Sequence, residues 1–256
     1  FGARVAECID LEKVLEIAGS AVEVFDTPPV PTSPMPATGL HIGVARDEAF
    51  GFYYPDDLEA FEAADAELVP VDMIRDAALP DLDGLFIGGG FPEVHAAALS
   101  ANASMRESVR TALEAGLPAY AECGGLMYLC RSLQWKGQVH PMAGVFAADT
   151  VMHDRPQGRG YARFTPLSSG LWPTTGKEQR AHEFHYASLD NLVSPTFGRR
   201  VTRGHGVDGR HDALVKHNTQ AGFIHLRHSE QSPWVTDFLE FVAATRAGAA
   251  ANARSS

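Results

Sequence analysis

The stretch that most constrains the fold is PAYAECGGLMYLC, residues 118–130. A short apolar run ends in Glu-Cys-Gly-Gly and turns at once into a second apolar run with helical character. A buried structural cysteine does not need two glycines after it. A nucleophile on a tight turn does, because the backbone folds back closely between strand and helix. The stretch therefore predicts a strand–turn–helix junction with Cys123 at the turn.

Cys123 would be well placed for covalent chemistry at such a junction. The helix that follows points its N-terminal end at the sulfur, which favours the thiolate. The backbone N–H of Gly124 is then available to bind a developing oxyanion, and a good donor of this kind contributes roughly 3 kcal/mol. Cys130, seven residues on in the same predicted helix, is interpreted as an inert core residue.

Strands and helices alternate around this junction, which predicts an α/β fold with a mostly parallel, doubly wound sheet. The segments typical of strands are LHIGVAR, AELVPV, GLFIGGG and LPAYAE. After about residue 140 the pattern becomes rich in short β-like runs, and a final helix is predicted from SPWVTDFLEFVAAT.

The prolines suggest where domains meet. Residues 1–25 have a rough amphipathic period typical of a helix, and residues 26–39 carry five prolines, which cannot continue it. We expect a linker there, one large domain over residues 40–246, and a disordered tail over residues 247–256.

Composition excludes several classes of function. The net charge of −11 argues against nonspecific nucleic-acid binding, and no apolar run is long enough to cross a membrane. Three cysteines form neither a disulfide framework nor a zinc cluster, so we expect a reducing, cytoplasmic setting. No signal peptide is visible, and no G-x-x-x-x-G-K-[ST] phosphate loop is present.

A thiol nucleophile needs a base, and His225 is the best candidate among eleven histidines, because it ends an apolar strand near the edge where ligands collect. The glycine cluster IGGGFPE, residues 87–93, ends another strand, where its backbone N–H groups can complete an oxyanion hole or hold a carboxylate. The segment HEFHY, residues 182–186, has histidines three apart rather than four, so helical zinc-protease geometry fails and no metal site is expected.

The order and spacing of several segments resemble the glutamine amidotransferase half of the cobyrinic acid a,c-diamide synthase family. The resemblance runs from about residue 40 to 245. The segments that carry it are VARDEAFGFYYPDDLEAFEAADAELVPV, DGLFIGGGFPEVHAAALSAN, AYAECGGLMYL, MAGVF, AHEFHYASL and AGFIHLRH. It implies a flavodoxin-like, three-layer sandwich of the class I glutamine amidotransferase type. It also implies that glutamine is hydrolysed and that its ammonia amidates two acetate side chains of a tetrapyrrole.

Residue by residue, the resemblance implies that Cys123 is the glutaminase nucleophile and that His225 raises its nucleophilicity. Gly89, Gly90 and Gly124 would stabilise the oxyanion. Other class I amidotransferases orient the histidine with a Pro-x-Glu pair, and none follows His225. Glu183 is one candidate for the orienting acid, and an acid from another domain is an equal one.

The family's ATP-dependent synthetase domain has no counterpart in this chain beyond residues 1–25, which resemble its last helix. We therefore expect L-glutamine and a tetrapyrrole as substrates, with a synthetase domain in cis or in trans. No cofactor is expected on this chain, and ATP and Mg²⁺ are expected on the synthetase domain.

Three alternatives stay open at this point. The tetrapyrrole acceptor is cobyrinic acid or another one, such as sirohaem or a sirohydrochlorin derivative. The same junction also occurs in cysteine hydrolases of the intracellular-peptidase type, which need neither AHEFHY nor a proline linker. A catalytically dead binding module is the third, and the retained Cys123 and His225 argue against it.

Overall fold

The computed structural model describes residues 2–21, 39–172 and 176–254. The chain divides into two units, Phe1–Ser33 and Pro34–Ser256. The first holds α1 (Gly2–Cys8) and α2 (Leu11–Gly19), where one continuous helix was predicted. The helix breaks because Asp10 caps α2, with its carboxylate accepting from Lys13 N at 2.9 Å. Of the predicted linker, residues 26–38 lie outside the described residues.

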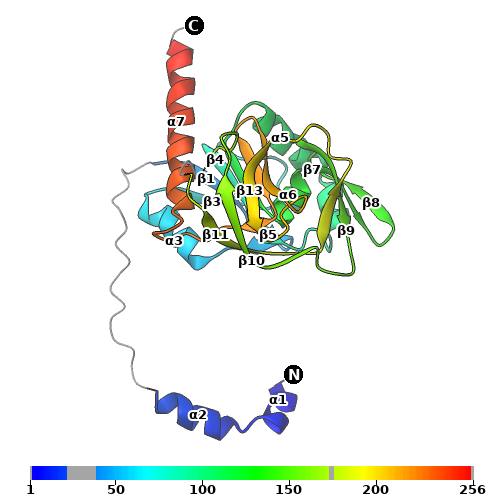
Figure 1. The fold of residues 1–256 in the computed structure, drawn as a ribbon, viewed down its shortest axis with the longest axis vertical. Helices are drawn as coiled ribbons and strands as arrows, with labels where there is room; N and C mark the ends of the chain where they lie inside the picture. The colour runs from blue at the N-terminus through cyan, green and yellow to red at the C-terminus, as the bar shows by residue number, and fades with distance from the viewer. Residues whose placement is uncertain (1, 22–38, 173–175, 255–256) are drawn as a thin grey trace. The chain divides into compact units, whose positions relative to one another are not determined.

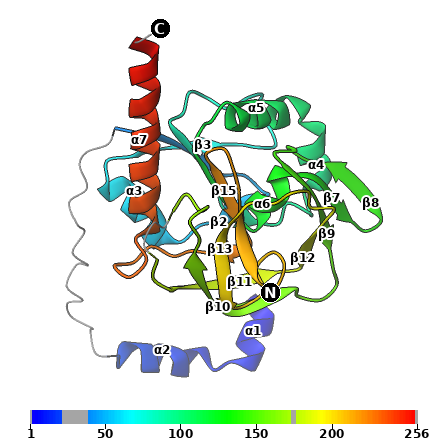
Figure 2. The ribbon, with the colours of Figure 1, turned by 45° about the horizontal axis from the view of Figure 1, so that its top comes forward.

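In the described part of the second unit, ten strands form one sheet, whose curl Figures 1 and 2 show. In spatial order they are β16 (Ile224–His225), β11 (Gln179–His185), β10 (Gly158–Pro166), β13 (Phe197–Arg203), β14 (His211–Lys216), β15 (Thr219–Gly222), β6 (Ala119–Glu122), β4 (Gly84–Ile87), β1 (His41–Ala45) and β3 (Glu67–Val71).

The sheet has a parallel half and an antiparallel half. Strands β3, β1, β4, β6 and β15 are parallel, and the pairs from β15 to β16 are antiparallel. Only Phe223 separates β15 from β16 in sequence, although four strands lie between them in the sheet. Those strands must therefore curl round until β11 meets β16, which brings β11 to the carboxyl end of β6, where Cys123 lies.

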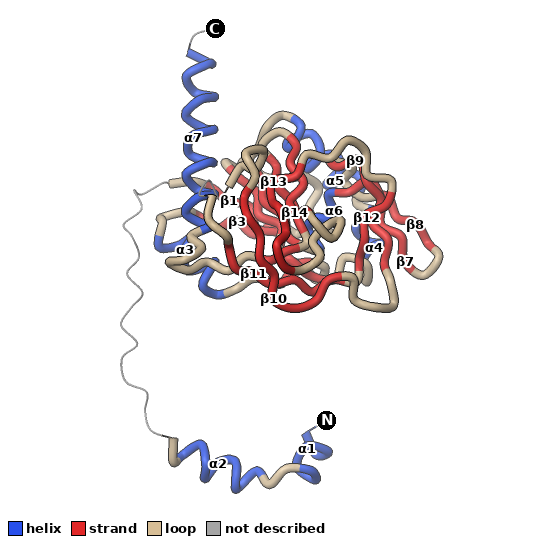
Figure 3. Tube along the Cα trace, viewed as in Figure 1, coloured by secondary structure: helices blue, strands red, loops and turns tan. Residues whose placement is uncertain are grey.

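Two smaller sheets and five helices complete the described part of this unit. One sheet, seen on the opposite side from α7 in Figure 3, has the order β12 (Ala187–Asp190), β9 (Phe146–Met152), β7 (Cys130–Trp135) and β8 (Gln138–Pro141). The other pairs β2 (Phe50–Phe52) with β5 (Gly89–Gly90). The helices are α3 (Pro55–Ala63), α4 (Ala96–Ala101), α5 (Ala103–Glu114), α6 (Gly124–Leu129) and α7 (Trp234–Arg254).

Two apolar clusters pack on opposite faces of the parallel strands. On β4, Leu85 and Ile87 join the cluster with α4, α5 and α6, while Phe86 between them joins the cluster with α3 and α7. On β6, Tyr120 stacks on Phe86 with ring centroids 5.7 Å apart. Alternate residues of a strand face opposite sides, so this pattern gives the predicted three-layer α/β sandwich. The predicted fold class is confirmed.

Two predicted boundaries are wrong. The helix after Cys123 ends at Leu129, and the chain continues as β7, so Cys130 lies in a strand. The predicted disordered tail is helical up to Arg254, because α7 runs on through its alanine-rich end.

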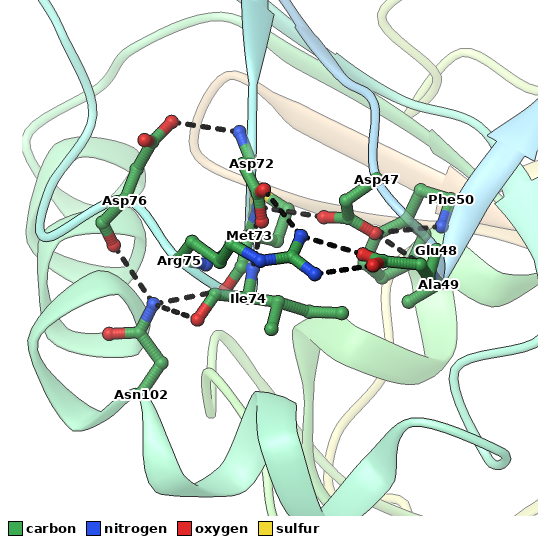
Figure 4. A network of polar contacts seen from close by, with 10 residues as sticks. All are labelled: Asp47, Glu48, Ala49, Phe50, Asp72, Met73, Ile74, Arg75, Asp76 and Asn102. Atoms are coloured by element: carbon green, nitrogen blue, oxygen red, sulfur yellow. Dashed lines mark hydrogen bonds and ion pairs between the residues drawn. The ribbon is translucent and has the colours of Figure 1, made fainter.

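Hydrogen bonds join the loop after β1 to the loop after β3 (Figure 4). The Asp47 carboxylate accepts hydrogen bonds from Ala49 N at 2.7 Å, Phe50 N at 3.1 Å and Met73 N at 2.7 Å. The Asn102 amide, at the start of α5, donates to the Met73 carbonyl at 3.2 Å. Because Phe50 begins β2, these contacts fix the strand that supports Gly89–Gly90.

The buried carboxylate of Asp57 joins α3 to the start of α7, accepting from His228 N at 2.6 Å and Trp234 Nε1 at 3.0 Å. Burial, and then the charge of Glu122, raise the pKa of Asp57 to about 7. The folded state then holds an extra proton between about pH 4 and 7, so stability should fall as pH rises through that window.

Replacing Asp57 by asparagine keeps an acceptor oxygen and removes the loss of stability that accompanies rising pH. We expect urea unfolding to show that the free energy of unfolding of Asp57→Asn, relative to that of the wild type, rises by on the order of 2 kcal/mol between pH 4.5 and pH 8. The conservative variant Asp81→Asn, at an exposed position, is the control. Parallel stability–pH curves for wild type and Asp57→Asn would contradict the assignment.

Candidate active site

Cys123 lies on the turn between β6 and α6, with a backbone φ of +48° and ψ of −99°. Such a conformation is strained for a residue with a side chain and is typical of a nucleophile elbow. Its N–H donates to the Gly222 carbonyl at 2.8 Å, and its carbonyl accepts from Met127 N at 3.0 Å. The thiol lies 3.9 Å from the Phe184 carbonyl of β11. Strands β15 and β11 therefore both contact the elbow.

Gly124 and Gly125 are required by close packing beneath the elbow. A Cβ at Gly125 would overlap the carbonyl oxygen of Ile87 on β4. A Cβ at Gly124 would lie 3.1 Å from Gly90 N. Gly124 is the first residue of α6, where helical N–H groups have no acceptor within the helix. The Gly124 and Gly90 backbones therefore approach each other beside Cys123.

The backbone of Gly89 and Gly90 lies on another side of the site. A Cβ at Gly90 would overlap the Ala49 carbonyl, and one at Gly89 would lie 2.9 Å from Cε1 of His225. The structure thus brings together all the residues predicted to form the nucleophile, base and oxyanion site. With N–H donors beside a thiol and an imidazole, the arrangement can carry out acyl transfer.

His225 is buried against Glu122, a residue that the sequence interpretation left without a role. Its Nδ1 lies 3.2 Å from Glu122 Oε2. Burial by itself would lower the pKa of His225, but hydrogen bonds to Cys123 and Glu122, and their negative charges, raise the pKa to about 10. The imidazolium form of His225 is therefore stabilised beside Cys123.

A second imidazole covers the face of His225. His182 of β11 is its cross-strand partner, and the rings stack with centroids 4.9 Å apart at 21°. The Tyr54 hydroxyl lies 2.9 Å from His182 Nδ1. Burial, and then the charge of His225, lower the pKa of His182, which keeps its ring neutral beside the imidazolium. The segment HEFHY thus contributes one side chain to the site.

Glu183 is not the acid that orients His225. The register pairs it with Ile224, so its side chain leaves the opposite face of the sheet from His182. There it accepts from His205 N at 2.6 Å and Gly206 N at 2.8 Å. The observed partner is Glu122, and its position at the end of the strand, one residue before the nucleophile, was the available signal.

Cys130 is fully buried at the start of β7, and burial raises the pKa of its thiol to about 12. It is a core residue, as predicted, although it lies in a strand. Within residues 2–21, 39–172 and 176–254, no group of three or more His, Cys, Asp or Glu side chains is arranged to hold a metal ion. No helix in these ranges is long and apolar enough to cross a membrane.

The fold and this site define a glutamine amidotransferase domain. The chain belongs to the CobB/CobQ-like glutamine amidotransferase domain family, whose model matches residues 41–233. The resemblance predicted from the sequence is therefore confirmed. Family membership decides against the peptidase-type hydrolase.

The chain is 40% identical over 245 residues to a cobyrinate a,c-diamide synthase of Magnetococcus marinus, covering 93% of this chain and 52% of the relative. It is 38% identical to the enzyme of that name from Archaeoglobus fulgidus, covering 87% and 48%. The chain therefore spans about half the length of these relatives.

Solved structures share the fold at low sequence identity. PurLQS of Thermotoga maritima matches with a TM-score of 0.61 and 13% identity, covering 81% of this chain and 99% of that one. A glutamine amidotransferase of the same organism matches with a TM-score of 0.55 and 11% identity, covering 81% and 97%.

Proposed function

We propose that this domain hydrolyses glutamine through a cysteine thioester and supplies the ammonia for a,c-diamidation of cobyrinic acid in cobalamin biosynthesis. The observation that carries the proposal is the joint position of Cys123 on its strained elbow, His225 beside it, and the glycine backbone around both. The names of the relatives support cobyrinic acid over sirohaem or a sirohydrochlorin derivative as the acceptor.

The reaction begins when the Cys123 thiolate attacks the carboxamide carbon of glutamine. The resulting oxyanion is stabilised by the N–H of Gly124 and by N–H groups of Gly89–Gly90. His225 gives its proton to the nitrogen as the C–N bond breaks, and ammonia leaves. His225 then takes a proton from water as water attacks the glutamyl thioester, which releases glutamate and restores the thiol.

Ammonia must then reach its acceptor without escaping. Four exposed aromatic side chains belong to segments that border the site: Phe52, Phe91, Tyr161 and Phe184. An apolar rim of this kind suits a covering surface that excludes water. The proposal assigns that surface to a synthetase domain in cis or in trans, which would use ATP and Mg²⁺ to activate the tetrapyrrole carboxylates.

The glutaminase step is tested by incubating the chain with an electrophilic glutamine analogue and mapping the adduct by peptide mass spectrometry. We expect one adduct, on Cys123, because it combines the elbow with a neighbouring base. Excess glutamine should protect it, and Cys123→Ser should not react. Cys130 serves as the internal control, since it is buried and its thiol stays protonated.

Labelling that glutamine does not block would contradict a glutamine pocket. If the analogue fails while a generic alkylator still labels Cys123, a synthetase domain added in trans decides the matter. Labelling restored by that domain supports a pocket completed on docking, and labelling still absent contradicts the proposal.

A further inference from the structure

The Glu122 carboxylate contacts the ring of His225, and its other hydrogen bonds hold it in that position. One oxygen lies 3.2 Å from His225 Nδ1. The other accepts from Leu226 N at 2.8 Å and from the Tyr120 hydroxyl at 2.7 Å. The side chain is only 3% exposed, so an ionised carboxylate there depends on these donors.

The contact with Glu122 decides which nitrogen of His225 faces the thiol. An ionised carboxylate can only accept, so Nδ1 must carry a proton in both charge states of the ring. Nε2 is then the nitrogen that exchanges a proton with Cys123. Glu122 thus fixes the ring's tautomer and its orientation, and its charge offsets that of the imidazolium.

A buried chain of polar groups holds Glu122 in turn. Arg199 of β13 is fully buried and donates from Nη2 to the Tyr120 hydroxyl at 3.4 Å. Its Nη1 lies 3.6 Å from Asp212 Oδ2. Asp212 also accepts from Phe223 N at 2.9 Å, in the link that leads into β16. The chain therefore connects both sides of the Glu122–His225 contact through the core.

We propose that Glu122 is the positioning residue for His225 and that Tyr120 and Arg199 hold its carboxylate in place. The proposal rests on the glutaminase function above. It accounts for the glutamate directly before the nucleophile and for a charged arginine buried in β13. An acid supplied by another domain is then unnecessary for orienting His225.

The test is Glu122→Gln, which preserves shape but allows an amide to donate to Nδ1. Donation there puts the ring proton on Nε2, so His225 can no longer accept the thiol proton. We expect kcat for glutamine to fall roughly 10³- to 10⁴-fold, while KM changes less than about threefold. The rate of Cys123 alkylation by iodoacetamide, measured against pH without glutamine, should move to higher pH.

The matched control is Glu183→Gln, a buried glutamate on the opposite face of the adjacent strand, which should leave the alkylation curve in place. Glu122→Asp keeps the charge and should restore part of the lost rate. If Glu122→Gln does not fold, Tyr120→Phe takes its place, with a smaller shift in the same direction. An unchanged curve in a folded Glu122→Gln or Tyr120→Phe variant would overturn the proposal.

The two measurements separate this inference from the function on which it rests. A shifted alkylation curve in the variant, with no glutamine hydrolysis by the wild type even after a synthetase domain is added in trans, would support the positioning role and refute the glutaminase. Wild-type hydrolysis that Glu122→Gln leaves intact would refute only the positioning role.

Discussion

Replacing Cys123 by serine or alanine is expected to reduce glutamine hydrolysis by roughly 10⁴-fold or more, because the thioester can no longer form. His225→Ala should cost nearly as much. The double variant should be no worse than the more damaged single one, since the two side chains act as a unit and their effects do not add. Steady-state ammonia release from all three variants measures this.

The matched control is Cys130→Ser, which makes the same replacement of sulfur by oxygen seven residues away. That side chain is fully buried in β7 and has no part in the proposed chemistry. Its activity per folded molecule should stay within about twofold of the wild type, although burial of a hydroxyl costs stability. A folded Cys123→Ala variant that still releases ammonia at the wild-type rate would remove Cys123 from the mechanism.

The parallel half of the sheet was predictable because its determinants are local. Strands β1, β3, β4 and β6 are short, largely apolar runs bounded by turn residues or a helix, and the glycine-flanked Cys123 marks where one run ends. The antiparallel half carries little such information. Its curl depends on pairings between strands distant in sequence, such as β10 with β13, which no local pattern specifies.

The same limit explains the error over the acid. Glu122 and His225 are 103 residues apart and meet because β15 pairs in parallel with β6, which sets Gly222, three residues before His225, beside Glu122. Glu183 is adjacent in sequence to His182, which does reach the site, but a shift of one residue along a strand turns the side chain to the other face. The residue types in the site were therefore readable, whereas finding the carboxylate that faces His225 required the register of the strands.

Replacing Gly125, the second glycine after Cys123, is expected to have the other large effect, on stability and on activity. A Cβ at Gly125 would overlap the backbone carbonyl of Ile87, which lies in a central strand and cannot move aside. Alanine also favours helix over glycine by about 1 kcal/mol, but overpacking against backbone costs about 3 kcal/mol or more, so the clash wins. Gly125→Ala should lower Tm by roughly 6–12 °C.

Where that variant folds, the elbow must shift, and a displacement of about 1 Å is expected to cost about 10²-fold in glutaminase activity. The control is Gly248→Ala on α7, another helical glycine, whose added Cβ meets nothing within 4 Å. It should leave activity intact and leave Tm unchanged or raise it slightly. Equal Tm and activity in the two variants would mean that Gly125 only continues a helix. A larger loss of Tm and activity in Gly125→Ala would mean that Gly125 is required by its close approach to the Ile87 carbonyl of β4.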